Sequence, residues 1–236
     1  MYPPIITNYR AKSVEGLSLD AVYINFLGCL SYFTSVCMLY FSPLVRNEYA
    51  LRHGGDSYPL ININDLVYGG HSLICVLIIA WQMLFSNYKR PHNQRLSSTV
   101  KLLSLVGILV CAGLLVHAYE INNTRRHYEL VDVAIIFGSI KLCMSAIKYM
   151  PQVYWNYERK SVKGFSLVQP ALDIAGSILS FLQLYIDAYL ANDLHAIFKN
   201  PVKLCLAVET ITFNTVFMIQ GYIYKDEPTL YNSKRQ

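Results

Sequence analysis

Long apolar blocks separated by polar connections, the longest of them a predicted loop at 43–63, dominate the pattern of this chain. The blocks cover residues 18–41, 64–86, 98–118, 129–157, 166–191 and 200–224. Each is about 20 residues or longer, which is the length that an α-helix needs to cross the hydrocarbon core of a bilayer. Apolar residues fill these blocks almost continuously instead of recurring on one face. The pattern therefore predicts membrane-spanning helices.

The first ten residues predict the end of a further helix. Pro3 and Pro4 stand in an apolar start that runs into the polar connection 10–17. Ten residues reach only about half way across a bilayer. We therefore expect the complete protein to carry about ten to fifteen more apolar residues before Met1, which would make seven helices in all.

Composition supports a membrane protein. The chain has 236 residues, of which 54% are hydrophobic and 15% charged, against about 25% charged in soluble domains. A net charge of +5 elsewhere suggests nucleic acid, but here Lys and Arg lie mostly in the connections, so we expect a lipid partner and no nucleic acid. All six cysteines lie inside apolar blocks, which favours packing over a metal or disulfide framework.

A duplication organises the chain. Residues 2–18 align without a gap on residues 150–166, at an offset of 148 (151 − 3). The matched positions share turn or membrane-interior chemistry: Pro3-Pro4 with Pro151-Gln152, Lys12-Ser13 with Lys160-Ser161, Gly16 with Gly164, Asn25 with Asp173 and Gly28 with Gly176. Proline inside a helix supplies a hinge, so Pro3, Pro4, Pro151 and Gln152 are hinge candidates. Such a repeat is typical of transporters.

The predicted fold is all-α and integral to the membrane. Two three-helix repeats, 1–86 and 129–224, are joined by a linker helix at 98–118 and followed by a cytosolic tail at 225–236. An odd linker returns the second repeat to the orientation of the first, so the repeats should be parallel, with the pathway between them.

Loop charge predicts the orientation. Twelve Lys and Arg residues lie on the side that holds the connections 10–17, 87–101 and 158–165 and the tail, against six on the other side. The richer side should face the cytosol. Asn122, in the sequon Asn122-Asn123-Thr124, then lies on the lumenal side, where a glycan can be added.

Ionisable residues within the apolar blocks mark a candidate site. Lys141 and Lys148 are seven residues apart and share one helix face. Asp173 lies in the next block, one turn after Gln169. Each such charge costs roughly 2.5–3.5 kcal/mol on insertion scales, so these residues imply a polar cavity or mutual pairing.

Each candidate also has an alternative explanation. Lys148 could reach the cytosolic headgroups along its own stem. Asp173 could be the structural partner of a lysine. Asp65 could cap its helix or bind a proton.

The chain resembles the PQ-loop proteins, and within that family the cystinosin group and its fungal relatives. The likeness covers nearly the whole chain, and the residues that carry it lie in its second half: Ile140-Lys141-Leu142, Ile147-Lys148-Tyr149-Met150-Pro151-Gln152, Leu172-Asp173-Ile174-Ala175-Gly176 and Thr212-Phe213-Asn214-Thr215-Val216-Phe217-Met218-Ile219-Gln220. The resemblance implies proton-coupled export of L-cystine from an acidic organelle (lysosome, vacuole or endosome) to the cytosol by alternating access.

The resemblance also implies roles for individual residues. Asp173 would be the main proton-binding carboxylate and Asp65 a second one. The remaining residues would form or adjoin the substrate site: Lys148, Lys141, Asn156, Gln169, Asn25 and Asn214. Two positions depart from the family pattern, because Pro4 replaces the glutamine of the first turn and Asn214 replaces an aspartate implicated in proton coupling.

Other functions are weighed against this one. The sequence has no enzyme signature and predicts no cofactor and no metal. A seven-helix sorting or signalling receptor shares this architecture but moves no solute. A transporter of cationic amino acids is a further alternative, whereas a sugar site would need neither Lys148 nor Asp173. Trafficking or regulatory proteins are the expected protein partners.

Overall fold

The computed structural model describes residues 2–52, 61, 63–92, 94–107, 109, 113, 130–190 and 201–224. Its labelled helices are α1 (Tyr2–Ala11), α2 (Leu19–Phe41), α3 (Pro43–Arg52), α4 (Ile63–Leu84), α6 (Leu130–Ile147), α7 (Tyr149–Arg159), α8 (Val168–Leu190) and α9 (Pro201–Ile223). Another helix covers Ser98–Gly107. Within the described residues, β pairing is limited to a single bridge between Ser13 and Lys89. The protein is therefore all-helical over its described part.

Length and composition make this a helical membrane protein. Three helices are long and apolar enough to cross a bilayer: Leu19–Phe41, Ile63–Leu84 and the combined segment Leu130–Arg159. Large apolar side chains point outward, as lipid-facing residues do; Val67 on α4 and Leu179 on α8 are 63% and 65% exposed. The predicted linker helix is described only in part, so the seven-helix plan stays a prediction.

The helix bounds follow the apolar blocks closely. α2, α4, α8 and α9 begin and end within about two residues of the predicted spans. Asp65 lies in the first turn of α4, because that helix begins at Ile63. Asp65 is therefore inside the helix and is not its N-cap residue. A negative charge in the first turn still stabilises the helix, because the N-terminal end of the helix dipole is positive.

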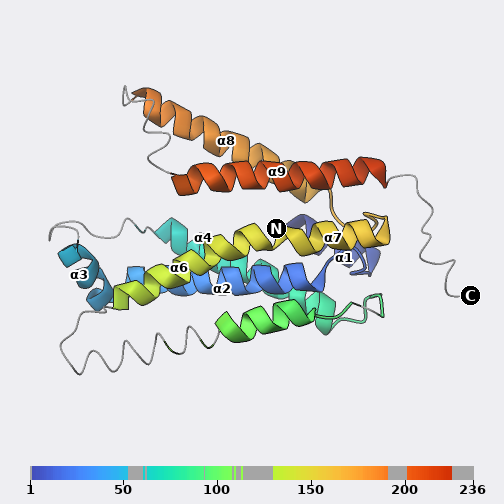
Figure 1. Cartoon of the computed structure of the whole chain (residues 1–236), viewed down its shortest axis with the longest axis horizontal. Helices are drawn as coiled ribbons and strands as arrows, with labels where there is room; N and C mark the ends of the chain where they lie inside the picture. The colour runs from blue at the N-terminus through green and yellow to red at the C-terminus, as the bar shows by residue number, and fades with distance from the viewer. Residues whose placement is uncertain are drawn as a thin grey trace, which may run out of the picture. The chain divides into compact units, whose positions relative to one another are not determined.

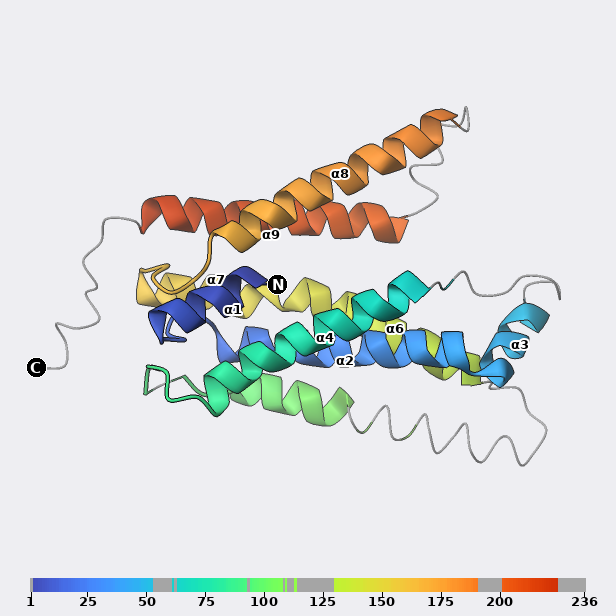
Figure 2. The same ribbon diagram turned by 180° about the vertical axis from the view of Figure 1, so that it is seen from behind.

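The chain divides into two compact units. Unit 1 comprises residues 1–18, 82–92 and 149–236, and unit 2 comprises residues 19–81 and 93–148. In unit 2, α2 and α6 lie side by side over much of their length (Figure 1). In unit 1, α8 packs against α9 (Figure 2), and α7 also contacts α9.

Helix α3 corrects a sequence prediction. Residues 43–63 are expected to be a polar loop, yet Pro43–Arg52 is helical. The hydroxyl of Ser42 accepts a hydrogen bond from the backbone N–H of Val45 at 3.4 Å, which is the geometry of an N-cap. Pro43 occupies the first helical position, where its missing N–H does no harm. The Ser-Pro pair is thus a start signal that the polar composition concealed.

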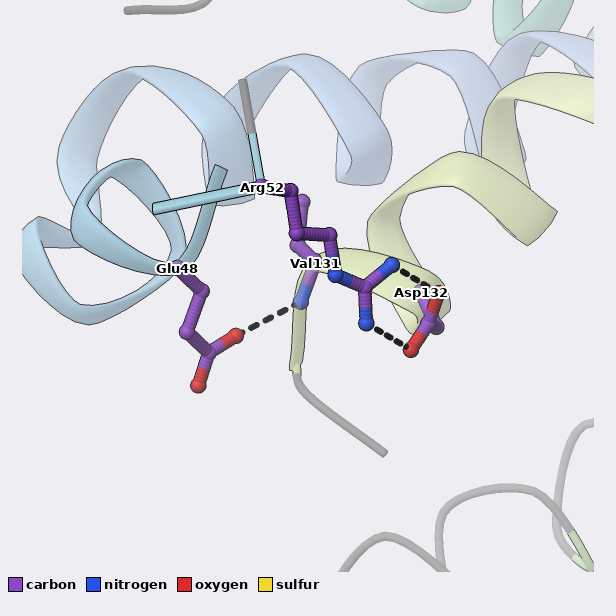
Figure 3. Close-up of polar contacts among 4 residues, drawn as sticks. All are labelled: Glu48, Arg52, Val131 and Asp132. Carbon is purple, nitrogen blue, oxygen red and sulfur yellow. Dashed lines mark hydrogen bonds and ion pairs between the residues drawn. The ribbon is translucent and has the colours of Figure 1, made fainter. Parts of the chain in front are cut away.

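Side chains of α3 hold this helix against the start of α6 (Figure 3). Arg52 donates two hydrogen bonds of 2.6 Å to the two carboxylate oxygens of Asp132. Glu48 accepts a hydrogen bond of 2.9 Å from the backbone N–H of Val131, one of the donors left unpaired at a helix start. Val45, which is 1% exposed, packs on Val131 and Ala134 in a small apolar core.

The apolar block at 129–157 is helical but interrupted. Its helices α6 and α7 are separated by Lys148, three residues before Pro151. Proline has no N–H to donate to the carbonyl four residues earlier, which here is Ile147, and so it breaks the regular ladder at this point. Pro151, predicted as a hinge, therefore accounts for the interruption of the helix at Lys148.

Candidate functional site

The two copies of the duplicated turn, residues 10–17 and 158–165, adopt matching conformations. Lys12 and Lys160, 148 residues apart (160 − 12), both have left-handed backbones, with φ of 47° and 48°. One residue later, the hydroxyls of Ser13 and Ser161 accept hydrogen bonds from the N–H groups of Glu15 and Lys163. A left-handed residue after the last helical turn is a common way to end a helix. The duplication thus extends to backbone geometry.

The two turns approach each other within unit 1 at a pair of glycines. A Cβ atom built on Gly16 would lie 1.9 Å from the carbonyl carbon of Gly164. Gly164 also has a φ of +82°, which L side chains rarely adopt. Only glycine permits this backbone contact, and the sequence repeat alone does not reveal it.

Gln152, predicted as a hinge residue, links α7 to the first of the two turns. Its side-chain oxygen accepts a hydrogen bond of 2.8 Å from the N–H of Ser18, and its amide nitrogen donates to the carbonyl of Gly16 at 2.9 Å. Trp155, one turn later on α7, donates to the carbonyl of Glu15. Pro3 and Pro4 lie in the first turn of α1, and Pro4 occupies the position that corresponds to Gln152. Side chains of α7 therefore hold the loop at residues 15–18, which belongs to the first copy of the duplicated turn.

Asn156 is completely buried next to Gln152. Its exposure is 0%. Its side-chain oxygen accepts a hydrogen bond of 3.0 Å from Gln152, and its amide nitrogen donates to the side-chain oxygen of Gln220 at 3.0 Å. Sequence reasoning missed Gln220 as a partner because it lies 64 residues away on α9.

Asp173 and Gln169 are brought together on α8 as predicted. The amide nitrogen of Gln169 donates to a carboxylate oxygen of Asp173 at 2.7 Å. Four residues separate them, so they stand one turn apart on the same helix face. The amide oxygen of Gln169 is buried and has no hydrogen-bond partner within the described part of the chain. A vacant buried acceptor thus adjoins a carboxylate.

Tyr149 and Asn214 form a second polar group in unit 1. Asn214 is 1% exposed and donates to the carbonyl of Thr210 at 2.7 Å. The Tyr149 hydroxyl interacts with Thr210 and Asn214 and lies within electrostatic range of Asp173. The Tyr149 ring stacks on Phe213, with centroids 5.2 Å apart. Tyr149 is absent from the predicted site, although it directly follows Lys148.

Unit 2 holds the two intramembrane lysines. Lys141 on α6 contacts the buried sulfur of Cys29 at 3.7 Å, and its stem passes Gly28 on α2. Lys141 and Lys148 interact electrostatically, in agreement with their predicted common face. Asn25, one turn before Cys29, has a buried side-chain oxygen with no hydrogen-bond partner among the described residues.

Asp65 lies apart from the lysines in sequence but in the same unit. It interacts electrostatically with Tyr32 on α2. The ring of Tyr32 meets that of Tyr68 edge to face, with centroids 6.2 Å apart. The predicted glycosylation residue Asn122 lies outside the described residues.

Comparison with known proteins shows that both turns lie in segments that match one protein family. The family described as "PQ loop repeat" matches residues 2–45 and 133–193. A cystinosin homolog of Dictyostelium discoideum is 32% identical over 231 residues, which cover 96% of this chain and 76% of that protein. A cystinosin of Drosophila melanogaster is 32% identical over 223 residues, covering 94% and 54%. A cystine transporter of Saccharomyces cerevisiae is 28% identical over 240 residues, covering 95% and 88%. The chain spans 53% to 60% of the length of the animal relatives that it matches.

Proposed function

This chain belongs to the PQ-loop family of cystinosin-like membrane proteins, and we propose that it carries L-cystine, coupled to protons, from an acidic organelle to the cytosol. The names of its relatives, cystinosin and cystine transporter, support the substrate. The doubled turn and the interrupted helix support alternating access, because repeats and broken helices are the usual parts of such transporters.

The observation that carries the proposal is the Asp173–Gln169 pair. A carboxylate and a vacant buried amide oxygen stand on one face of α8. Both groups attract an ammonium, and cystine carries two of them. An ionisable residue within an apolar segment is a functional candidate by default. Placing its charge in the membrane is costly, and function is the usual reason that such a residue is kept. A binding site for a zwitterionic amino acid explains both groups at once.

Lysines supply the complementary charge. Cystine has two carboxylates, and Lys148 and Lys141 each offer an ammonium on α6 or at its end. Asn25, with its vacant side-chain oxygen, is a further polar contact in this scheme. Asn156 and Asn214 supply amides, and Asn156 retains one N–H and one oxygen lone pair beyond its two hydrogen bonds.

Proton coupling is assigned to Asp173, with Asp65 as the second carboxylate. An acidic lumen would load the proton onto Asp173, and a neutral cytosol would release it. Asn214 cannot take a proton in the relevant range, so it binds without titrating. Orientation follows the loop charges, with the turns at 10–17 and 158–165 and the C-terminus on the cytosolic side.

Uptake by vesicles that contain the purified protein tests the proposal directly. The vesicles are given radiolabelled L-cystine or L-lysine in parallel, with and without an acidic exterior that represents the lumen. We expect uptake of cystine that rises with the pH gradient and little uptake of lysine. Uptake of lysine alone would favour a transporter of cationic amino acids. The absence of uptake of either solute would favour a receptor.

A further inference from the structure

A directional chain of amides runs through unit 1. It begins at the N–H of Ser18, which donates to the oxygen of Gln152 at 2.8 Å. The Gln152 nitrogen donates to the oxygen of Asn156 at 3.0 Å, and the Asn156 nitrogen donates to the oxygen of Gln220 at 3.0 Å. The Gln220 nitrogen ends the chain on the carbonyl of Val153 at 2.9 Å. Three side-chain amides therefore point the same way along four hydrogen bonds.

Backbone groups at both ends fix this direction. A carbonyl can only accept, so Gln220 must turn its nitrogen toward Val153 and its oxygen toward Asn156. A backbone N–H can only donate, so Gln152 must turn its oxygen toward Ser18 and its nitrogen toward Asn156. Flipping Asn156 would place oxygen against oxygen on one side and nitrogen against nitrogen on the other. The network, and not the packing, thus decides which end of the Asn156 amide faces which helix.

The first repeat contains the same arrangement without its beginning. Asn8 donates to the oxygen of Gln82 at 2.9 Å, and Gln82 donates to the carbonyl of Ile5 at 3.1 Å. Asn8 and Ile5 correspond to Asn156 and Val153 at the offset of 148 (156 − 8 and 153 − 5). Pro4 replaces the glutamine, however, and the buried oxygen of Asn8 has no hydrogen-bond partner among the described residues. Only the second repeat holds its asparagine from both sides.

We propose that Gln220 is a positioning residue that, with Gln152, fixes the polarity of the Asn156 amide for the substrate. The inference rests on the proposed function, because it takes Asn156 as a substrate contact. The amide nitrogen of Asn156, which faces Gln220 on α9, then offers one N–H to the substrate. The amide oxygen, which faces Gln152, offers one lone pair. A substrate carboxylate pairs with the first and an ammonium with the second. The order of these groups along the ligand is thereby selected.

The same chain of bonds joins the site to the first turn. Gln152 also donates to the carbonyl of Gly16, so a ligand that pulls on Asn156 acts on the turn between α1 and α2 through one side chain. In the first repeat Pro4 cannot make this link. Gln82 therefore holds Asn8 for structural reasons alone, and it serves as the internal control for Gln220.

Matched substitutions separate positioning from stability. Gln220→Met and Gln82→Met remove the same two hydrogen bonds from residues that are 7% and 4% exposed. Both variants should therefore lower the melting temperature of the purified protein to a similar extent. For cystine uptake, we expect Gln220→Met to raise KM about fivefold, the factor of one ordinary hydrogen bond. Gln82→Met should leave KM within about twofold of the unaltered protein, since Asn8 has no role in the site.

Several outcomes overturn the proposal. An unchanged KM in Gln220→Met, or equal increases in both variants, would show that Gln220 is only structural. If Gln220→Met does not fold, Gln220→Asn replaces it, because its amide is too short by one methylene to bridge Val153 and Asn156; an unchanged KM there has the same meaning. Failure of the unaltered protein to take up cystine would instead contradict the proposed function, and with it this inference.

Discussion

Gly16 and Gly164 show how single residues set the geometry of this protein. Their backbones meet where the two turns of the repeat approach each other within unit 1. A side chain at either position would enter the space of the other turn. In the sequence both glycines look like ordinary turn punctuation, because their contact joins residues 148 positions apart (164 − 16).

Substituting Gly16 should therefore destabilise the protein. Its added Cβ would lie 1.9 Å from the carbonyl carbon of Gly164, and backbone cannot move aside as a side-chain tip can. Overpacking typically costs about 1–3 kcal/mol, and we expect Gly16→Ala to lie at the upper end of that range. Thermal unfolding of the purified variant measures this cost.

Gly176→Ala is the matched control, since a Cβ built there meets nothing within 4 Å. It should leave the melting temperature unchanged or raise it slightly, because alanine favours a helix over glycine. Equal melting temperatures for Gly16→Ala and Gly176→Ala would show that the two turns do not approach as described.

Sequence reasoning identified some site residues and could not reach others. The Gln169–Asp173 pair follows from helical spacing, because residues four apart share a face. Gln82 and Gln220 have partners 74 and 64 residues away, and no local pattern connects an amide to a distant asparagine. Their signal lies in the repeat itself: both stand in the third helix of a repeat, but at an offset of 138 (220 − 82), which the ungapped alignment does not include.

At the scale of elements, the apolar blocks determine the helices, and proline determines where they break. The predicted spans and the observed helices agree because continuous apolar sequence leaves the backbone no partner in lipid except itself. Helix α3 was missed because its composition is polar, with Arg46, Glu48 and Arg52 in ten residues. Its identity as a helix depends on the Ser42 cap and on packing against α6, and distant packing is invisible to local composition.

The attachment of α3 to α6 tests which interaction matters more. Arg52 and Asp132 are 35% and 29% exposed, and a partly exposed ion pair contributes about 0–1 kcal/mol. Val45 is 1% exposed, and truncating it removes two buried methyl groups worth about 1.5–3 kcal/mol with the cavity left behind. We therefore expect Val45→Ala to lower the melting temperature more than Arg52→Gln does. The reverse order would indicate that the ion pair dominates this contact.

At the scale of the whole molecule, the duplication is the feature that sequence predicted best. Matching left-handed lysines, serine turns and asparagine–glutamine pairs all recur at corresponding positions. The departures are equally informative, because the proline at position 4 leaves the first copy without the link that Gln152 makes in the second. Orientation and the linker helix rest on loop charge and apolar length alone.

The orientation prediction can be tested by chemical labelling. A cysteine placed at Lys160 should react with a membrane-impermeant maleimide only from the cytosolic side, and Asn122 should carry a glycan that Asn122→Gln removes. The unaltered protein, whose native cysteines include the exposed Cys143, is labelled in parallel as the control. Labelling of Lys160→Cys from the lumenal side alone would reverse the proposed orientation.

The most direct test of the central claim is the response of cystine transport to a pH gradient in the Asp173→Asn variant. Vesicles containing this variant or the unaltered protein are assayed for cystine accumulation under an imposed gradient, and for cystine exchange at equal pH as a measure of binding and folding. Asparagine keeps the shape of Asp173 and an oxygen that accepts a hydrogen bond from an ammonium, but it does not take up a proton. We expect exchange to persist while gradient-driven accumulation is lost. Full accumulation with unchanged pH dependence in Asp173→Asn would contradict the account and leave Asp65 as the remaining coupling carboxylate.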